Sequence, residues 1–329
     1  MMDLSIIIPV YNTDVNKMNR CLDSILEISN DISYELIIVN DGSNYELVIQ
    51  YEKMITSKKQ KNIKIVNQKN QGVSEARNVG MNIANGKYIM FVDSDDEING
   101  DVLKKEYFNQ EFDLIIFDIS LITKHNKIIK SKMHCNQGII RDNHILINEL
   151  IYNGIFGGPC AKLYKKDFLM KNNLKFDNTL IEGEDKKFNL DFFKRCPYSY
   201  YIKENLYNYY FLNTSLNGRW KKSGDLMVNN FISNYNEEKK AIDDCNKLNI
   251  LKENTLKNIF LECMIIVELK LSNKKELLNK LNCFAMDIDI DYQNLSLIDK
   301  IKYKVVIKKR WKTIKMLNII RKIYLNFFK

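Results

Sequence analysis

Short apolar runs alternate with amphipathic segments over the first hundred residues. Helical spacing of apolar side chains recurs in Lys17–Ile28, Tyr45–Ile55 and Val73–Ala84. The runs between these segments predict strands at Ser5–Val10, Glu35–Val39, Ile63–Asn67 and Tyr88–Val92. The second and the fourth are typical of strands buried on both faces. This alternation predicts an α/β fold with a doubly wound, mostly parallel sheet and helices on both faces.

The pattern changes in the rest of the chain. Residues Phe112–Ile122 are strand-like, and the polar stretch Lys124–Lys132 indicates a hairpin tip. From Asp225 to Asp287 the pattern is that of amphipathic helices, without a motif that carries chemistry. We therefore predict three parts, which are residues 1–98, residues 99–222 and a helical C-terminal extension, 223–329.

Composition restricts the class of protein. Of the 329 residues, 45% are hydrophobic and 28% are charged, which is ordinary for a globular protein. No signal peptide opens the chain, and no apolar run approaches the roughly 20 residues that span a bilayer. The seven cysteines are scattered without a CxxC pair, which favours reduced thiols in a cytoplasmic protein. The three histidines lack the spacing of zinc ligands.

The net charge of +9 is concentrated at the C-terminal end. Residues 297–329 hold nine Lys and two Arg against the single Asp299, so residues 1–296 are close to neutral. On one continuous helix, a basic face would form opposite apolar residues that include Val306 and Ile314, and its members would be Lys304, Lys308, Lys312, Lys315 and Lys322. This pattern favours peripheral contact with an anionic membrane. A helix packed on the body with a solvated basic side, and nucleic-acid contact, are the alternatives.

Three carboxylates follow the strand Tyr88–Val92 within four positions, in Asp93-Ser94-Asp95-Asp96. Ligands of open α/β sheets bind at the carboxyl ends of the strands, where this cluster would lie. A cation such as Mg²⁺ or Mn²⁺, shared with ligand phosphates, would relieve the repulsion between the carboxylates. A solvated acidic turn is the alternative for this stretch alone.

Polar residues follow the other strands as well. Because the loops after parallel strands gather at one edge, we expect a single crevice lined by an aromatic ring, acids, an amide and an arginine, from Pro9, Tyr11, Asn12, Asp41, Asn70, Arg77 and Asp93. Such a set suits a nucleoside diphosphate. The chain has neither GxGxxG nor GxxxxGK[ST], which excludes a Rossmann dinucleotide site and a P-loop.

Four motifs in this order resemble the family 2 inverting glycosyltransferases of the GT-A fold, of the type found in bacterial polysaccharide biosynthesis. They are SIIIPVYN from Ser5, VNDGS from Val39, NQGVSEARNVG from Asn70 and FVDSDD from Phe91. The resemblance is strong over residues 4–97 and looser over 155–215. It implies that residues 1–98 bind a nucleotide sugar and that residues 99–222 bind the acceptor and carry the catalytic base, with a small second sheet.

The resemblance also implies roles for individual residues. Pro9, Tyr11 and Asp41 would hold the nucleobase and ribose, and Asn70 and Arg77 would lie near the base and diphosphate. Asp93 and Asp95 would be the DxD pair that binds Mn²⁺ or Mg²⁺, with Asp95 the more direct ligand. Asn12, Ser94 and Lys162 complete the donor-binding set. The base would be Asp185, with Glu184 as the alternative or an acceptor contact.

The expected function is metal-dependent transfer of a hexosyl or N-acetylhexosaminyl group from a UDP-sugar to a glycan hydroxyl. The expected acceptor is a lipid-linked oligosaccharide in capsule, exopolysaccharide or lipopolysaccharide synthesis, reached at the inner face of the membrane through residues 297–329. The alternatives are a sugar-phosphate nucleotidyltransferase and a non-catalytic nucleotide-sugar-binding scaffold. One departure from the family is Tyr210, which stands where an arginine is usual, and Asp96 has no assigned role.

Overall fold

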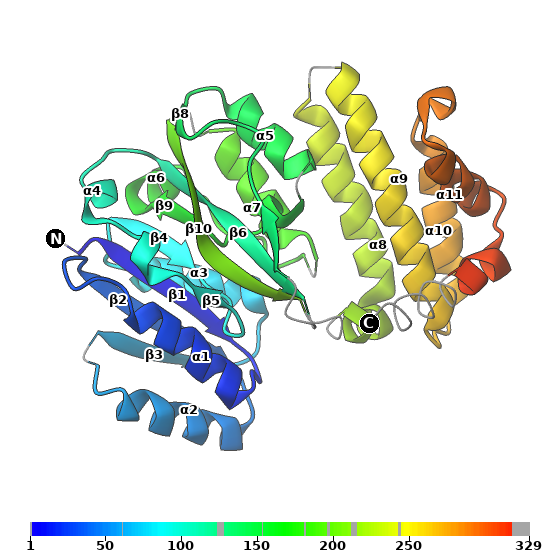
Figure 1. Cartoon of the computed structure of the whole chain (residues 1–329). Helices are drawn as coiled ribbons and strands as arrows, with labels where there is room; N and C mark the ends of the chain where they lie inside the picture. The colour runs from blue at the N-terminus through cyan, green and yellow to red at the C-terminus, as the bar shows by residue number, and fades with distance from the viewer. Residues whose placement is uncertain are drawn as a thin grey trace. The chain divides into compact units, whose positions relative to one another are not determined.

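The computed structural model describes residues 2–60, 62–123, 128–152, 154–180, 182–195, 198–211, 216–242 and 245–317 (Figure 1). The chain forms two compact units, Met1–Leu180 with Glu184–Leu212, and Ile181–Gly183 with Asn213–Lys329. The first unit is α/β and the second is helical. The two predicted parts 1–98 and 99–222 thus contribute to one unit, because their strands share one sheet.

The sheet has ten strands, and eight of them follow the order β3-β2-β1-β4-β9-β6-β10-β5, while β7 pairs with β6 and β8 with β10. Its first half is parallel, as predicted, because β1 pairs in parallel with β2 and β4, and β2 with β3. These strands are β1 Leu4–Val10, β2 Tyr34–Asp41, β3 Ile63–Gln68 and β4 Tyr88–Phe91. The parallel arrangement brings the carboxyl ends of β1, β2, β3 and β4 to one edge.

Helices cover both faces of this half. Alternate side chains of β1, such as Ile6 and Ile8, join the core that Met18 and Leu22 of α1 complete. The opposite face of β1 presents Ile7, whose side chain lies so close to Gly80 of α3 that a Cβ there would meet it at 2.4 Å. The helices of this half are α1 Val15–Leu26, α2 Tyr45–Ser57 and α3 Val73–Ile83. The predicted fold class is confirmed here.

The second half of the sheet is mixed. β9 lies antiparallel between β4 and β6, whereas β10 runs parallel to β6. β7, which lies within the stretch predicted as a hairpin tip, and β8 both join the same sheet. The expectation of a separate small sheet was therefore wrong for the described residues. The remaining elements of this unit are β5 Glu97–Ile98, β6 Leu114–Thr123, β7 Ile128–Ser131, β8 Gly138–Ile140, β9 Lys162–Lys165, β10 Ser199–Phe211, α4 Lys105–Phe108, α5 Asn143–Tyr152, α6 Lys166–Lys171 and α7 Glu184–Phe193.

The helical unit is built from α8 Leu216–Lys240, α9 Cys245–Glu268, α10 Lys274–Asp287 and α11 Leu297–Ile307 (Figure 1). Leucine, phenylalanine and cysteine side chains fill its core, among them Leu256, Cys263, Leu277 and Leu281. Within the described residues, none of the helices combines the length and hydrophobicity that a bilayer-spanning segment requires.

The predicted single basic helix near the C-terminus was wrong. α11 ends at Ile307, and Lys309 has a left-handed backbone with φ of 51°. The amide of Arg310 donates to the carbonyl of Val305 at 2.9 Å, which closes the helix end. Val306 and Ile314, expected on an apolar membrane face, are fully buried within the unit. Lys322 lies outside the described residues.

Replacing Gly86 with alanine should destabilise the protein by about 1–3 kcal/mol, because the new Cβ cannot be accommodated. It would meet the backbone nitrogen of Ser5 at 2.4 Å and the carbonyl carbon of Leu4 at 2.5 Å. Urea unfolding measures the effect. Gly157→Ala is the control, since its Cβ would find no atom closer than 3.8 Å. Equal midpoints for both variants would show that this close approach is not required.

Candidate active site

The loops that follow β1, β2, β3 and β4 are joined by hydrogen bonds. The amide of Asn12 donates to the hydroxyl of Ser43 at 2.9 Å, which links the first loop to the second. The hydroxyls of Thr13 and Ser94 lie 2.6 Å apart and link the first loop to the loop after β4. The predicted convergence at one sheet edge is therefore confirmed.

Asp41 organises the turn after β3. It is 3% exposed, and its carboxylate accepts from the amides of Gln71 and Gly72, both at 2.8 Å. The side chain of Asn70 donates back to the carbonyl of Asp41 at 3.0 Å. Tyr11, by contrast, is 56% exposed and free to stack on a ring. Pro9 is buried in β1 opposite Val39, where it shapes the strand that leads to Tyr11.

The buried guanidinium of Arg77 lies at the centre of this edge. Arg77, on α3, is 2% exposed and forms ion pairs with Asp93, at 3.0 Å, and with Asp185. A third carboxylate, that of Glu184, lies 3.8 Å away. Burial lowers the pKa of this guanidinium, but the charges of Asp185 and Asp93 outweigh that effect and raise it. Arg77, predicted near the donor diphosphate, therefore holds the carboxylates of the site together.

Aromatic packing fixes the helix that carries Glu184 and Asp185. Phe188 of α7 stacks on Phe176 with ring centroids 4.0 Å apart, and both rings meet Phe91 of β4 edge-on. The guanidinium of Arg77 lies 5.1 Å above the ring of Phe176. The first turn of α7 is thereby held beside the end of β4, where its carboxylates also favour the helix dipole.

Asp185 is the more accessible member of the acidic pair. Its side chain is 32% exposed, whereas that of Glu184 is 9% exposed. Asp185 and Asp93 line one cavity of about 290 Å³, whose other walls are formed by Ile119, Gly158, Pro159, Cys160, Tyr207 and Tyr209. A carboxylate that faces such a cavity can take a proton from a bound hydroxyl. The fold thus brings Asp93 and Asp185, two of the predicted site carboxylates, to one cavity.

Asp95 and Asp96 point in different directions. The side chain of Asp95 is 46% exposed and forms an ion pair with Lys17 at 3.9 Å. Burial and then the charge of Asp93 raise the pKa of Asp95. Asp96 is 1% exposed and accepts from the hydroxyl of Tyr207 at 2.7 Å and from the amide of Tyr210 at 2.8 Å. Asp96 therefore anchors β10 to the acidic loop.

A cation from α1 lies over Tyr210, the residue that departs from the family pattern. The guanidinium of Arg20 is 4.0 Å from the centre of that ring and forms an ion pair with Glu97. It also donates to the carbonyl of Asp95 at 3.1 Å. No feature of the sequence pointed to Arg20, because this residue occupies an ordinary position in an amphipathic helix.

Lys162 lies behind the cavity wall. Predicted among the donor-binding residues, it is 1% exposed and donates to the carbonyls of Phe156, Gly158 and Cys160 at 2.9, 2.7 and 3.3 Å. Asn189 of α7 also donates to the carbonyl of Gly158, at 2.8 Å. In the structure Lys162 thus braces the glycine loop, and burial lowers its pKa to about 8.

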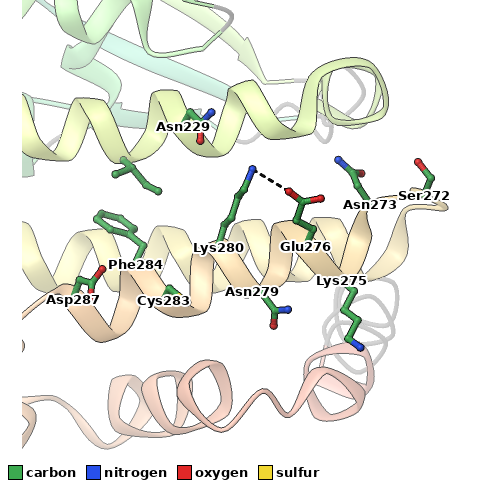
Figure 2. A pocket seen from close by; sticks show the side chains of 11 residues that line it. Asn229, Ser272, Asn273, Lys275, Glu276, Asn279, Lys280, Cys283, Phe284 and Asp287 are labelled. Carbon is green, nitrogen blue, oxygen red and sulfur yellow. Dashed lines mark ion pairs between the residues drawn. The ribbon is translucent and has the colours of Figure 1, made fainter.

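A groove of about 770 Å³, larger than the cavity that Asp185 lines, lies in the helical unit. It runs between α8 and residues 272–287, which include α10 (Figure 2). Lys280 points toward Glu276 across 3.4 Å, and it also forms an ion pair with Asp225 of α8. The lining also includes Asn229, Cys283, Phe284 and Asp287, and it contains none of the site residues that the sequence predicted. Its volume alone does not make it the reactive site.

Comparison with known proteins decides the family. The sequence profile of glycosyl transferase family 2 matches residues 5–172, just over half of the chain. The chain belongs to glycosyl transferase family 2. This membership favours sugar transfer over the nucleotidyltransferase alternative. The matched region contains all four loops of the crevice and Lys162, whereas Asp185, Tyr207 and Tyr209 of the cavity lie beyond it.

Two curated relatives cover most of this glycosyltransferase. Poly(ribitol-phosphate) β-N-acetylglucosaminyltransferase TarP of Staphylococcus aureus is 28% identical over 74% of this chain and 72% of its own length. The putative glycosyltransferase EpsH of Bacillus subtilis is 27% identical over 84% of this chain and 80% of its own length.

A solved structure supports the GT-A type of the fold. S. aureus TarS 1–349 in complex with UDP-GlcNAc superposes with a TM-score of 0.67 at 19% identity, covering 95% of this chain and 92% of that one. At this identity, the likeness concerns the fold alone. The predicted fold, including a helical C-terminal region, agrees with it.

The free energy of unfolding of the unaltered enzyme, minus that of the Lys162→Met variant, should rise as the pH increases from about 8 toward 10.5. The folded state releases the Lys162 proton near pH 8, whereas the unfolded chain retains it up to the ordinary value of 10.5. Deprotonation therefore favours folding within this window. Urea unfolding of both proteins at pH 7.5, 9 and 10 measures the difference. A difference that stays constant with pH would contradict the assignment of a buried, proton-releasing amine.

Proposed function

We propose that this glycosyltransferase moves a sugar from a UDP-sugar to a hydroxyl of a glycan acceptor, with inversion at the anomeric carbon. The observation that carries the proposal is the cavity that Asp93 and Asp185 line together, with Arg77 joining the two carboxylates. The binding of UDP-GlcNAc by TarS and the activity for which TarP is named make UDP-N-acetylglucosamine the first donor to test.

The donor would lie along the four converging loops. Tyr11, with its exposed ring, and Asp41 would contact the nucleobase, and Asn12 and Asn70 belong to the same wall. Ser94, held by Thr13, keeps the acidic loop beside this wall. The diphosphate would then point toward Asp93 and Asp95.

In this proposal the carboxylates of Asp93 and Asp95 would hold a divalent cation. Both supply the oxygen atoms that Mg²⁺ and Mn²⁺ prefer. The raised pKa of Asp95 arises from burial and from the charge of Asp93, and a cation would offset both. When bound, such a metal would neutralise charge on the departing diphosphate.

Asp185 would act as the general base. Its carboxylate would accept the proton of the acceptor hydroxyl as that oxygen attacks the anomeric carbon on the face opposite the diphosphate. Arg77 would keep this carboxylate charged before the reaction, because a neighbouring cation favours the ionised form. Glu184, buried behind it, would assist by holding Arg77 in place.

The acceptor in this proposal is a lipid-linked glycan that is assembled at the cytoplasmic face of the membrane. The basic segment 297–329 would keep the enzyme at that surface. The acceptor is tested with detergent-solubilised lipids extracted from membranes of the source cells. Incorporation of labelled N-acetylglucosamine into these lipids is measured.

Asp185→Asn should lower the rate of transfer by about 10²- to 10⁴-fold, which is the typical contribution of a general base. Binding of UDP should change little, because the amide keeps the shape and can still accept from Arg77. UDP release with UDP-GlcNAc and acceptor measures the rate, and calorimetry measures binding.

Asp191→Asn on the same helix is the matched control, since Asp191 pairs with Lys187 and does not line the cavity. Glu184→Gln separates the two acids and should retain more activity than Asp185→Asn. If Asp185→Asn transfers sugar at the rate of the unaltered enzyme, Asp185 is not the base.

A further inference from the structure

The side of α11 that faces away from the helical core exposes large aliphatic side chains. We call Leu297, Ile298 and Ile301 the outer face of α11, and these residues are 76%, 66% and 49% exposed. Leu297 and Ile301 are one helical turn apart, so they form a continuous surface. Single exposed apolar residues are common in proteins, but three on one short helix indicate a contact surface.

The orientation of α11 is fixed by contacts on its opposite side. Asp299 and Val306, which are seven residues apart on that side, are buried, and α11 packs on α9 and α10. Asn282 of α10 donates to the carbonyls of Val306 and Ile307 at 2.9 and 3.2 Å. The buried Asp299 forms ion pairs with Lys302 at 2.9 Å and with Lys257 of α9 at 3.8 Å. The outer face is therefore held outward by packing.

Exposed cations follow the aliphatic surface along the chain. Exposed basic residues follow Ile301 along α11 and the chain after it, and they are Lys304, Lys308, Lys309, Arg310, Lys312 and Lys315. Lys304 lies 5.4 Å from the ring centre of Tyr292. In the described part of the chain, no carboxylate forms an ion pair with any of these six residues. Their charge is thus available to a partner.

We propose that the outer face of α11 docks on an anionic phospholipid bilayer. Leu297, Ile298 and Ile301 would enter the boundary between headgroups and acyl chains, while the cations contact lipid phosphates. Against a second copy of this chain, the same cations would repel one another. Nucleic acid would leave the aliphatic residues without a contact. This inference rests on the membrane contact in the proposed function and narrows it to Leu297, Ile298 and Ile301 with the cations that follow them. Sugar transfer is measured separately, so failure of vesicle binding leaves the proposed reaction untouched.

The experiment uses the full chain and vesicles of phosphatidylcholine alone or with 30% phosphatidylglycerol. The protein should float with the anionic vesicles and not with the neutral ones. Leu297→Ser, Ile298→Ser and Ile301→Ser combined should weaken binding at least about tenfold, because aliphatic burial is lost. Lys308→Gln and Lys312→Gln should each weaken it about fivefold.

The control replaces three other exposed aliphatic residues of the helical unit, Leu226, Leu261 and Met286, which are 39%, 43% and 60% exposed. With all three changed to serine, vesicle binding should remain. Removing residues 318–329 should also leave it largely intact. Equal binding by the two triple variants, or binding lost only on truncation, would overturn the proposal. If the unaltered protein does not bind vesicles, and if light scattering shows a dimer that is lost when Leu297, Ile298 and Ile301 are changed to serine, the outer face of α11 is instead a self-association surface.

Discussion

The buried guanidinium of Arg77 is the interaction on which the arrangement of the site depends. A charge removed from water is tolerated only when carboxylates surround it. Arg77 finds them on two elements that are far apart in sequence, the loop after β4 and the first turn of α7. Satisfying this one cation therefore sets the position of Asp185 relative to Asp93. Packing of Phe91, Phe176 and Phe188 supports the same geometry.

Buried polar groups brace the cavity on its other sides. Tyr207 donates to Asp96 and accepts from the amide of Asp93 at 3.0 Å, so it links β10 to the acidic loop. Lys162 and Asn189 hold the carbonyls of the glycine loop, and Asn189 also accepts from Tyr164 at 2.6 Å. Satisfied networks of this kind are rigid, which suits a site that must place a donor and an acceptor hydroxyl in line.

The sequence was sufficient for the first half of the sheet, because a strand buried on both faces has an unmistakable run such as that from Ser5 to Val10. It also placed the polar loops at one edge, since parallel strands leave no other arrangement. It could not show that Arg77 pairs with Asp185, because 108 residues separate them and their approach depends on how α7 packs. For the same reason, the sequence could not show that Lys162 is buried behind the cavity wall.

The C-terminal region was the least predictable. Spacing suggested one basic helix, but the left-handed Lys309 and the capping by Asn282 end α11 before that face is complete. A helix end set by tertiary capping leaves no local signal in a segment without Gly or Pro. The exposed aliphatic residues Leu297, Ile298 and Ile301 precede the lysines on which the pattern was based.

The most direct test of the central claim is a crystal structure of the enzyme with UDP and Mn²⁺, with the metal located by anomalous scattering. The account predicts Mn²⁺ bonded to a carboxylate oxygen of Asp95 or Asp93 and to the diphosphate, uracil beside Tyr11, and Arg77 still paired with Asp185. UDP bound away from these loops, or Mn²⁺ bound at neither aspartate, would contradict it.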